Sequence, residues 1–154
     1  MKKLSVRQQK YCGFWEKLIK KFNEEKFFEE RPKAKISETV DKHYLQLLIR
    51  KGGIHFEWFL VGYPINKFQV ALHFEREDFN ENKELLNYFK SRKEEFKNDF
   101  EEELKFGSHN EISTHMFLEI ETDSMDKDTI EWGVKTMIKF YDTLKPILDE
   151  ELIE

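Results

Sequence analysis

Two His–Glu pairs lie in the stretch from His55 to Glu75, HFEWFLVGYPINKFQVALHFE. His55 and Glu57 precede a Gly-Tyr-Pro-Ile-Asn break, and His73 and Glu75 follow it. Side chains two residues apart on a strand point to the same face of a sheet. Imidazole and carboxylate groups can ligate zinc or exchange protons during catalysis. If both runs are strands, this stretch forms either a chemical site or the polar face of a sheet.

The spacing favours the polar sheet face, because strand alternation alone produces it. The sequence contains no HExxH motif, no phosphate-binding glycine loop, and no lysine two positions after Glu57 or Glu75, as a nuclease motif would require. We therefore expect no catalytic residue, no metal site and no cofactor here. Apolar residues share the same face, which favours recognition of a partner. The predicted contact residues are His55, Glu57, Phe59, His73, Glu75 and Phe117.

The elements that position these residues begin with a predicted hairpin. Leu45, Leu47 and Ile49 alternate before Gly52-Gly53, and Ile54, Phe56, Trp58 and Leu60 alternate after it. Glycine readily supplies the positive φ of a tight hairpin turn. A two-residue turn at Gly52-Gly53 places Leu47 opposite Trp58, with both apolar sets on one side. A third strand after Pro64 completes a meander, and pairing across its break brings His55 near His73 or Glu75.

Helical periodicity predicts three main helices around this meander. The first runs from a Ser5 cap to about Glu25, the second is capped by Asn80 and runs to about residue 104, and the third has Asp128 and Glu131 as a capping box. Pro146 is expected to kink or break the third helix. Further strand signals are a short edge element near residues 34–37, a KFG element, and a strand containing Met116, Leu118 and Ile120.

This order predicts an α+β fold. We expect one domain over residues 1–154, with an antiparallel sheet of four or five strands and three main helices mostly on one face. The 15 Phe residues among 154 argue against disorder over most of the chain. A lone cysteine, the lack of a signal peptide and the lack of a long apolar run favour a cytoplasmic protein without membrane contact.

The charge distribution offers a second function. Residues 1–51 contain 14 Lys and Arg against 7 Asp and Glu, whereas the whole chain has a net charge of −5. A basic region of this kind can bind nucleic acid if its charges form a continuous surface. The candidate residues on the first helix are Lys10, Lys17, Lys20 and Lys21.

Three segments resemble an uncharacterised prokaryotic domain of unknown function. They are YCGFWEKL, NKELLNYFKSRKEEFKNDFEEELKF and EWGVKTMIKFYDTLKPIL. The landmarks that match the family are Phe14-Trp15, Asn82-Lys83, Lys93, Trp132 and Pro146. The sequence departs from the family at Leu104-Lys105-Phe106, where a Trp-Glu commonly follows the leucine. The domain is often found after nuclease domains of the restriction-endonuclease, PD-(D/E)xK type, so the resemblance implies an accessory role and no known catalytic residues.

The sequence therefore favours a non-enzymatic interaction or accessory module, linked to nucleic-acid processing or defence against foreign DNA. Its expected partner is a protein, either a second copy in a dimer or another chain. A nucleic-acid-binding protein that uses the lysines of the first helix is the alternative. A metal-dependent enzyme on the outer face of the sheet ranks third.

Overall fold

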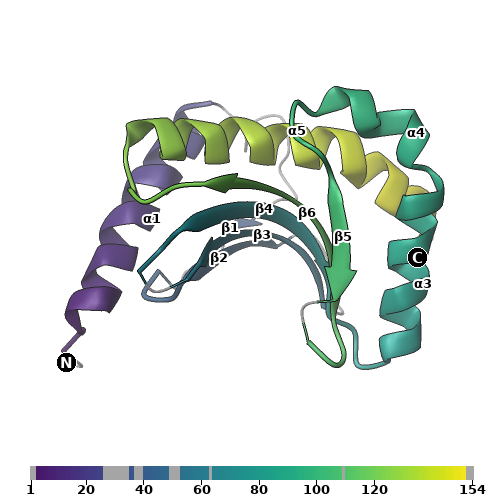
Figure 1. Ribbon diagram of the computed structural model, residues 1–154, viewed down its shortest axis with the longest axis horizontal. Helices are drawn as coiled ribbons and strands as arrows, with labels where there is room; N and C mark the ends of the chain where they lie inside the picture. Colours follow the sequence, from purple (N-terminus) through teal and green to yellow (C-terminus); the bar gives the residue numbers. More distant parts are fainter. Residues whose placement is uncertain are drawn as a thin grey trace.

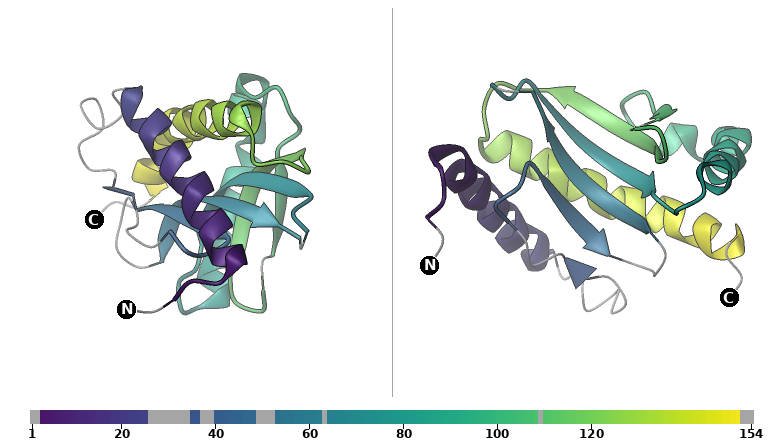
Figure 2. Two further views of the ribbon diagram at one scale, coloured as in Figure 1. Left: turned by 90° about the vertical axis from the view of Figure 1, so that its left-hand side faces the viewer. Right: turned by 90° about the horizontal axis from the view of Figure 1, so that it is seen from below.

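The computed structural model describes residues 3–25, 35–36, 40–48, 53–62, 64–108 and 110–151. A bowed antiparallel sheet lies beneath the long helix α5 (Lys127–Glu151), with α1 (Val6–Glu24) near one end and α3 (Phe79–Ser91) at the other (Figure 1). Seen from below, the strands lie in front of α1 and α5, so both helices cover the same side of the sheet (Figure 2). The predicted α+β class is confirmed.

The sheet has the order β1-β2-β3-β4-β6-β5, and every neighbouring pair is antiparallel. The strands are β1 (Lys35–Ile36), β2 (Tyr44–Leu48), β3 (Ile54–Val61), β4 (Lys67–Phe74), β5 (Lys105–Ser108) and β6 (Thr114–Glu121). The predicted meander is β2-β3-β4. The two-residue β1 extends the sheet at the edge where a short element was expected.

The predicted register of the first hairpin is wrong by two residues. Leu47 pairs with Phe56, and Trp58 pairs with Leu45. A shift of two keeps every side chain on its face, so the hydrophobic pattern does not distinguish the two registers. Ile49 and Gly52 lie outside the described residues. Gly53 has a φ of 76°, and a Cβ there would lie 2.4 Å from the backbone oxygen of Glu75, so the end of β4 requires a glycine at this position.

The hydrophobic core lies between the sheet and the helices. The inner side chains of the strands are at most 2% exposed: Leu45, Leu47, Ile54, Phe56, Trp58, Leu60, Phe68, Val70, Leu72, Phe74, Met116 and Leu118. The α1 stripe packs on them through Phe14, whose ring centroid lies 5.4 Å from that of Phe68, and through Phe22, 5.1 Å from Trp58. The predicted inner face of the sheet is therefore confirmed.

The second predicted helix is shorter than expected and is broken. Its N-cap is Asp78, whose side chain accepts a hydrogen bond from the backbone N–H of Asn80 at 2.8 Å. Asp and Asn are equally good caps, so the sequence did not distinguish them. The helix stops at Arg92, and the chain continues as α4 (Lys93–Phe96) and the 3-10 helix η1 (Lys97–Asp99). No glycine or proline marks this break, at which the Arg92 guanidinium binds Glu95 and Glu150, each at 2.7 Å.

The third predicted helix, α5, continues through Pro146 without ending. Leu144 and Leu148 on either side of the proline are fully buried, and this packing compensates for the backbone hydrogen bond that proline cannot donate. The first turn is capped by Asp126, whose Oδ1 accepts from the backbone N–H of Thr129 at 3.0 Å. Asp128 was the predicted cap, so the helix begins earlier than expected.

Close approach between α5 and the sheet depends on Gly133. Its carbonyl accepts a hydrogen bond from Trp58 Nε1 at 2.9 Å, and a Cβ at this position would lie 2.6 Å from a ring carbon of Phe68. No helix in the described residues combines the length and the apolar character needed to cross a bilayer.

Candidate functional site

The outer face is the side of the sheet opposite α1 and α5. Strand alternation places the following residues on it: Gln46, His55, Glu57, Phe59, Gln69, Ala71, His73, Glu75, His115, Phe117 and Glu119. The register arranges them in rows across the strands. His55, His73 and His115 form one row, and the next row contains Gln46, Glu57, Ala71 and Phe117.

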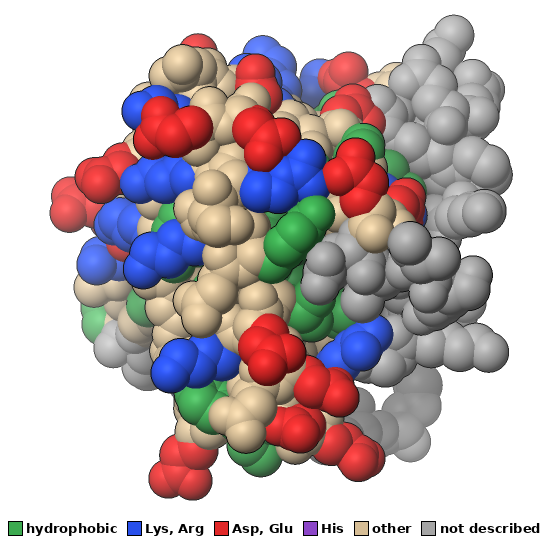
Figure 3. Space-filling model, turned by 90° about the vertical axis from the view of Figure 1, so that its right-hand side faces the viewer, with side chains coloured by type: hydrophobic (Ala, Val, Ile, Leu, Met, Phe, Trp, Pro, Cys, Tyr) green, Lys and Arg blue, Asp and Glu red, His purple; other side chains and the backbone are tan. Residues whose placement is uncertain are grey.

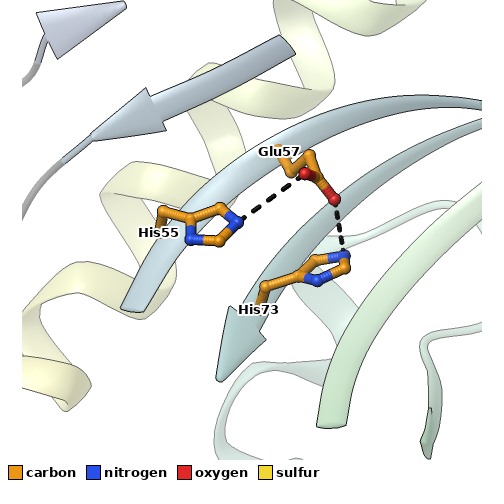
Figure 4. Close-up of side chains that lie close together, drawn as sticks. All are labelled: His55, Glu57 and His73. Carbon is orange, nitrogen blue, oxygen red and sulfur yellow. Dashed lines mark ion pairs between the residues drawn. The ribbon is translucent and has the colours of Figure 1, made fainter. Parts of the chain in front are cut away.

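Three of these residues form a compact group, which we call the His–Glu–His cluster: His55 and Glu57 on β3, and His73 on β4 (Figure 4). Glu57 Oε1 lies 3.6 Å from His55 Nε2, and Glu57 Oε2 lies 2.8 Å from His73 Nε2. The two imidazole rings stack with their centroids 5.4 Å apart. The predicted proximity of His55 to His73 is thus observed, because the two residues are direct cross-strand partners.

The cluster is not solvated, contrary to what a polar outer face suggested. The exposed fractions of His55, Glu57 and His73 are 5%, 3% and 1%. An ionised carboxylate at this depth needs a charged or hydrogen-bonded partner, because burial removes its hydration. Glu75, which pairs with His73, is more accessible, since its side chain is 37% exposed.

The environment shifts the titration of this cluster. Burial alone would lower the pKa of His73 and raise the pKa of Glu57, because burial disfavours the charged form of each group. Contacts reverse both effects. Glu57 and Glu75 raise the pKa of His73 to about 9, and His55 and His73 lower the pKa of Glu57 to about 2. Without a bound cation, the cluster therefore holds an imidazolium between two carboxylates.

Glu75 connects the cluster to the surface. Its Oε1 lies 3.0 Å from His73 Nδ1 and 3.8 Å from His55 Nε2. The contact with His73 lowers the pKa of Glu75. Beside it lies a hollow of about 610 Å³, lined by Gly53, Glu75, Arg76, Glu77, Asp78 and Glu81.

The two aromatic contact residues predicted on the outer face are half-buried. The Phe59 ring lies 4.9 Å from the His43 ring, and the Phe117 ring lies 4.6 Å from the His115 ring. Ala71 separates Glu57 from Phe117 along their row. The six predicted contact residues therefore share one face, with the polar cluster buried and the aromatic rings partly accessible.

The four predicted nucleic-acid-binding lysines lie on α1. Lys17 and Lys21 line a hollow together with Asp126 and Glu131, Lys10 lines another that includes Asp123, and Lys21 pairs with Glu25 at 3.9 Å. Lys20 is exposed and lines neither hollow. On the face over α3 and α4, acidic and basic side chains are interspersed (Figure 3). Lys10, Lys17 and Lys21 thus share their surroundings with carboxylates.

Asn82 has no structural role in the sequence analysis, yet it is fully buried and joins three segments of the chain. Its side chain bonds both the N–H and the C=O of Arg76, at 2.9 and 2.8 Å, and donates to the carbonyl of Ile112 at 2.9 Å. The Thr114 hydroxyl also donates to the Asn82 carbonyl at 2.8 Å. The family resemblance could have indicated this role, because Asn82 is one of the residues that match the family.

Comparison with known proteins assigns the family and leaves the activity open. Searches of curated proteins and of solved structures found no significant match to this chain. A family model matches residues 10–148, which include all six strands, the His–Glu–His cluster and Asn82. The chain therefore belongs to the family described as Domain of unknown function (DUF4268).

Proposed function

We propose that this chain is a non-enzymatic interaction or accessory module that contacts a protein through its outer face. The observation that carries the proposal is the position of Phe59 and Phe117. Both rings are half-buried on a sheet face against which none of the described helices packs. Partly exposed aromatic rings surrounded by polar groups are typical of recognition surfaces.

The charges of the outer face favour a protein partner over nucleic acid. Glu119 on this face pairs with Lys67 and Lys105, each at 3.5 Å, and accepts from Gln69. Glu75 adds a further carboxylate at the margin. Lys67 and Lys105 only offset Glu119 and Glu75 on this face, whereas nucleic-acid binding depends on an excess of basic groups. The family resemblance supports a role beside nucleic-acid-processing enzymes, which a protein contact would serve.

Self-association is the first form of this contact to test. Sedimentation equilibrium of the full chain over a range of concentrations should show a dimer, which Phe59→Lys dissociates without lowering the melting temperature. The matched control is Phe79→Lys, since Phe79 is an exposed aromatic residue at the start of α3 and is not one of the strand residues of the outer face. This control should dimerise like the wild type.

A wild type that is monomeric at every concentration would contradict the dimer. Crosslinking in cells then tests a different protein partner, which should be captured by the wild type and by Phe79→Lys but not by Phe59→Lys. If the folded wild type neither dimerises nor yields a crosslink sensitive to Phe59→Lys, the proposed function is wrong.

A further inference from the structure

We propose that His55, Glu57 and His73 bind a divalent transition-metal ion, with zinc as the best fit. This inference departs from the expectation of a metal-free contact surface, and it does not depend on the proposed function. Two imidazoles and one carboxylate are a donor set that suits zinc, whereas calcium and magnesium prefer oxygen ligands alone. One ligand atom from each of the three side chains lies within 4.8 Å of the others.

The spacing of the donor atoms is close to that expected for three side chains that bind one shared ion. Ligand atoms held about 2.0–2.1 Å from a tetrahedral zinc lie about 3.4 Å from one another. Glu57 Oε1 lies 3.6 Å from His55 Nε2 and Glu57 Oε2 lies 2.8 Å from His73 Nε2, so each imidazole faces a different oxygen of the carboxylate at close to that spacing. His55 and His73 are direct cross-strand partners, so the backbone already places both rings on the same side of the ion.

Glu57 Oε2 has an ion-pair partner in this cluster but no aligned hydrogen bond. The contact between Glu57 Oε2 and His73 Nε2 has the distance of an ion pair without the alignment of a hydrogen bond. Oε2 therefore has no hydrogen-bond partner among the described residues, although it is buried. Buried polar atoms normally have partners, and a metal ion at the centre of the cluster would supply one.

The neighbours of the two histidines orient them as a metal site requires. His73 turns Nδ1 toward Glu75 Oε1 at 3.0 Å, which directs Nε2 into the cluster. Histidines that ligate metals commonly donate their other ring N–H to a carboxylate in this way. Gln46 Nε2 lies 3.2 Å from His55 Nε2. Because an amide nitrogen can only donate, His55 Nε2 accepts this hydrogen bond with its lone pair, and a metal ion bound at that atom would displace the Gln46 amide.

An acidic hollow lies beside Glu75, which contacts the cluster. Glu77, Asp78 and Glu81 line this hollow together with Arg76, and an excess of carboxylates raises the local concentration of cations. Three protein ligands leave one position of a tetrahedral ion for water or for an oxygen or nitrogen donor of another molecule.

Metal binding can be measured on the full chain after treatment with a chelator. Zinc is titrated in competition with a chromophoric chelator at neutral pH, and cobalt(II) serves as the spectroscopic probe. We expect one ion per chain and an intense visible cobalt spectrum, as low-symmetry coordination gives. Glu57→Gln, which nearly preserves shape, should weaken zinc binding by about 100-fold or more, and Glu75→Gln by about 10-fold.

The matched control is His115→Gln. His115 supplies no ligand atom to the three-residue group, although its ring lies 5.1 Å from that of His73, so this variant should bind zinc more tightly than Glu75→Gln does. Circular dichroism in the presence of the chelator verifies that each variant is folded. If the folded wild type binds no zinc below millimolar concentration, or if Glu57→Gln binds as tightly as the wild type, the cluster is a self-contained ion-pair network and the inference is wrong. The wild-type result decides the matter even if a variant does not fold.

Discussion

His73 is the residue at which burial and charge oppose each other most strongly. Its side chain is 1% exposed and lies between Glu57 and Glu75. In the metal-free protein these carboxylates raise its pKa from 6.5 to about 9. A histidine with a raised folded-state pKa stabilises the fold below its unfolded pKa and loses that contribution as the pH rises through the folded value.

We therefore predict that the chelator-treated protein loses up to about 3 kcal/mol of unfolding free energy as the pH rises from 6.5 to about 9. Glu57 affects stability at the acidic end of the pH range. Its pKa is lowered from 4.5 to about 2, so its contribution is present above pH 4.5 and is lost as the pH falls toward 2. Urea unfolding at a series of pH values measures both limbs of this profile, the alkaline loss of unfolding free energy and the acidic one.

Glu57→Gln should flatten both limbs, because it removes the carboxylate that titrates at low pH and the main charge that raises the pKa of His73. His115→Gln is the control and should retain the slope between pH 6.5 and about 9. A wild-type profile without a slope in that range would show that His73 is not ionised in the fold.

The composition of the cluster was predictable at the residue scale, but its burial was not. Alternation placed His55, Glu57, His73 and Glu75 on one face, and pairing across the Gly-Tyr-Pro-Ile-Asn break brought the two histidines together. Strand periodicity identifies a face without revealing what lies against it. Histidine and glutamate are read as solvated by default, and only their mutual distances show that they neutralise one another in a buried place.

At the scale of elements, the contact between α5 and the sheet can be tested with a pair of glycines. Gly133→Ala should destabilise the fold by about 1–3 kcal/mol, because the added Cβ would lie 2.6 Å from the Phe68 ring. The control is Gly13→Ala in α1, where nothing lies within 4 Å of the added Cβ. This change should stabilise the protein by up to about 1 kcal/mol, since alanine favours helix more than glycine does. If both variants have the same unfolding free energy, α5 does not approach the sheet as closely as described.

The connection between β4, α3 and β6 depends on Asn82. Asn82→Ala should cost about 2–4 kcal/mol, because it leaves the backbone groups of Arg76 and Ile112 without their partner. Asn80→Ala is the control, since Asn80 is exposed and its backbone N–H still bonds Asp78. Equal melting temperatures for the two variants would contradict the connecting role of Asn82.

At the scale of the whole molecule, three of the four candidate lysines on α1 lie near acidic side chains. Lys17 and Lys21 line a hollow with Asp126 and Glu131, which come from the acidic part of the chain. We predict that fluorescence anisotropy with labelled DNA and RNA shows no lysine-dependent binding at low salt. The comparison is between the wild type and a variant with Lys10, Lys17, Lys20 and Lys21 changed to Gln. Tight binding that weakens steeply with salt in the wild type alone would instead support the nucleic-acid function.

The parts of the architecture that depend on local sequence patterns were predictable. The meander followed from short connections and alternation, and the helices followed from their apolar stripes. The position of β6 between β4 and β5 did not follow, because α3 and α4 lie between β4 and these last two strands in the chain. The break at Arg92 was also hidden, since long-range contacts with Glu150 hold it in place.

All three residues of the His–Glu–His cluster come from the consecutive strands β3 and β4. Contacts between neighbouring strands of a hairpin require little loop closure, and they form early when a chain folds. His115, by contrast, joins its row only after the chain has passed through α3 and returned as β6. The contacts of the cluster thus depend on one hairpin alone and not on the second half of the chain. We expect changes in this hairpin to alter the rate of folding, and changes in the docking of α5 to alter mainly the rate of unfolding.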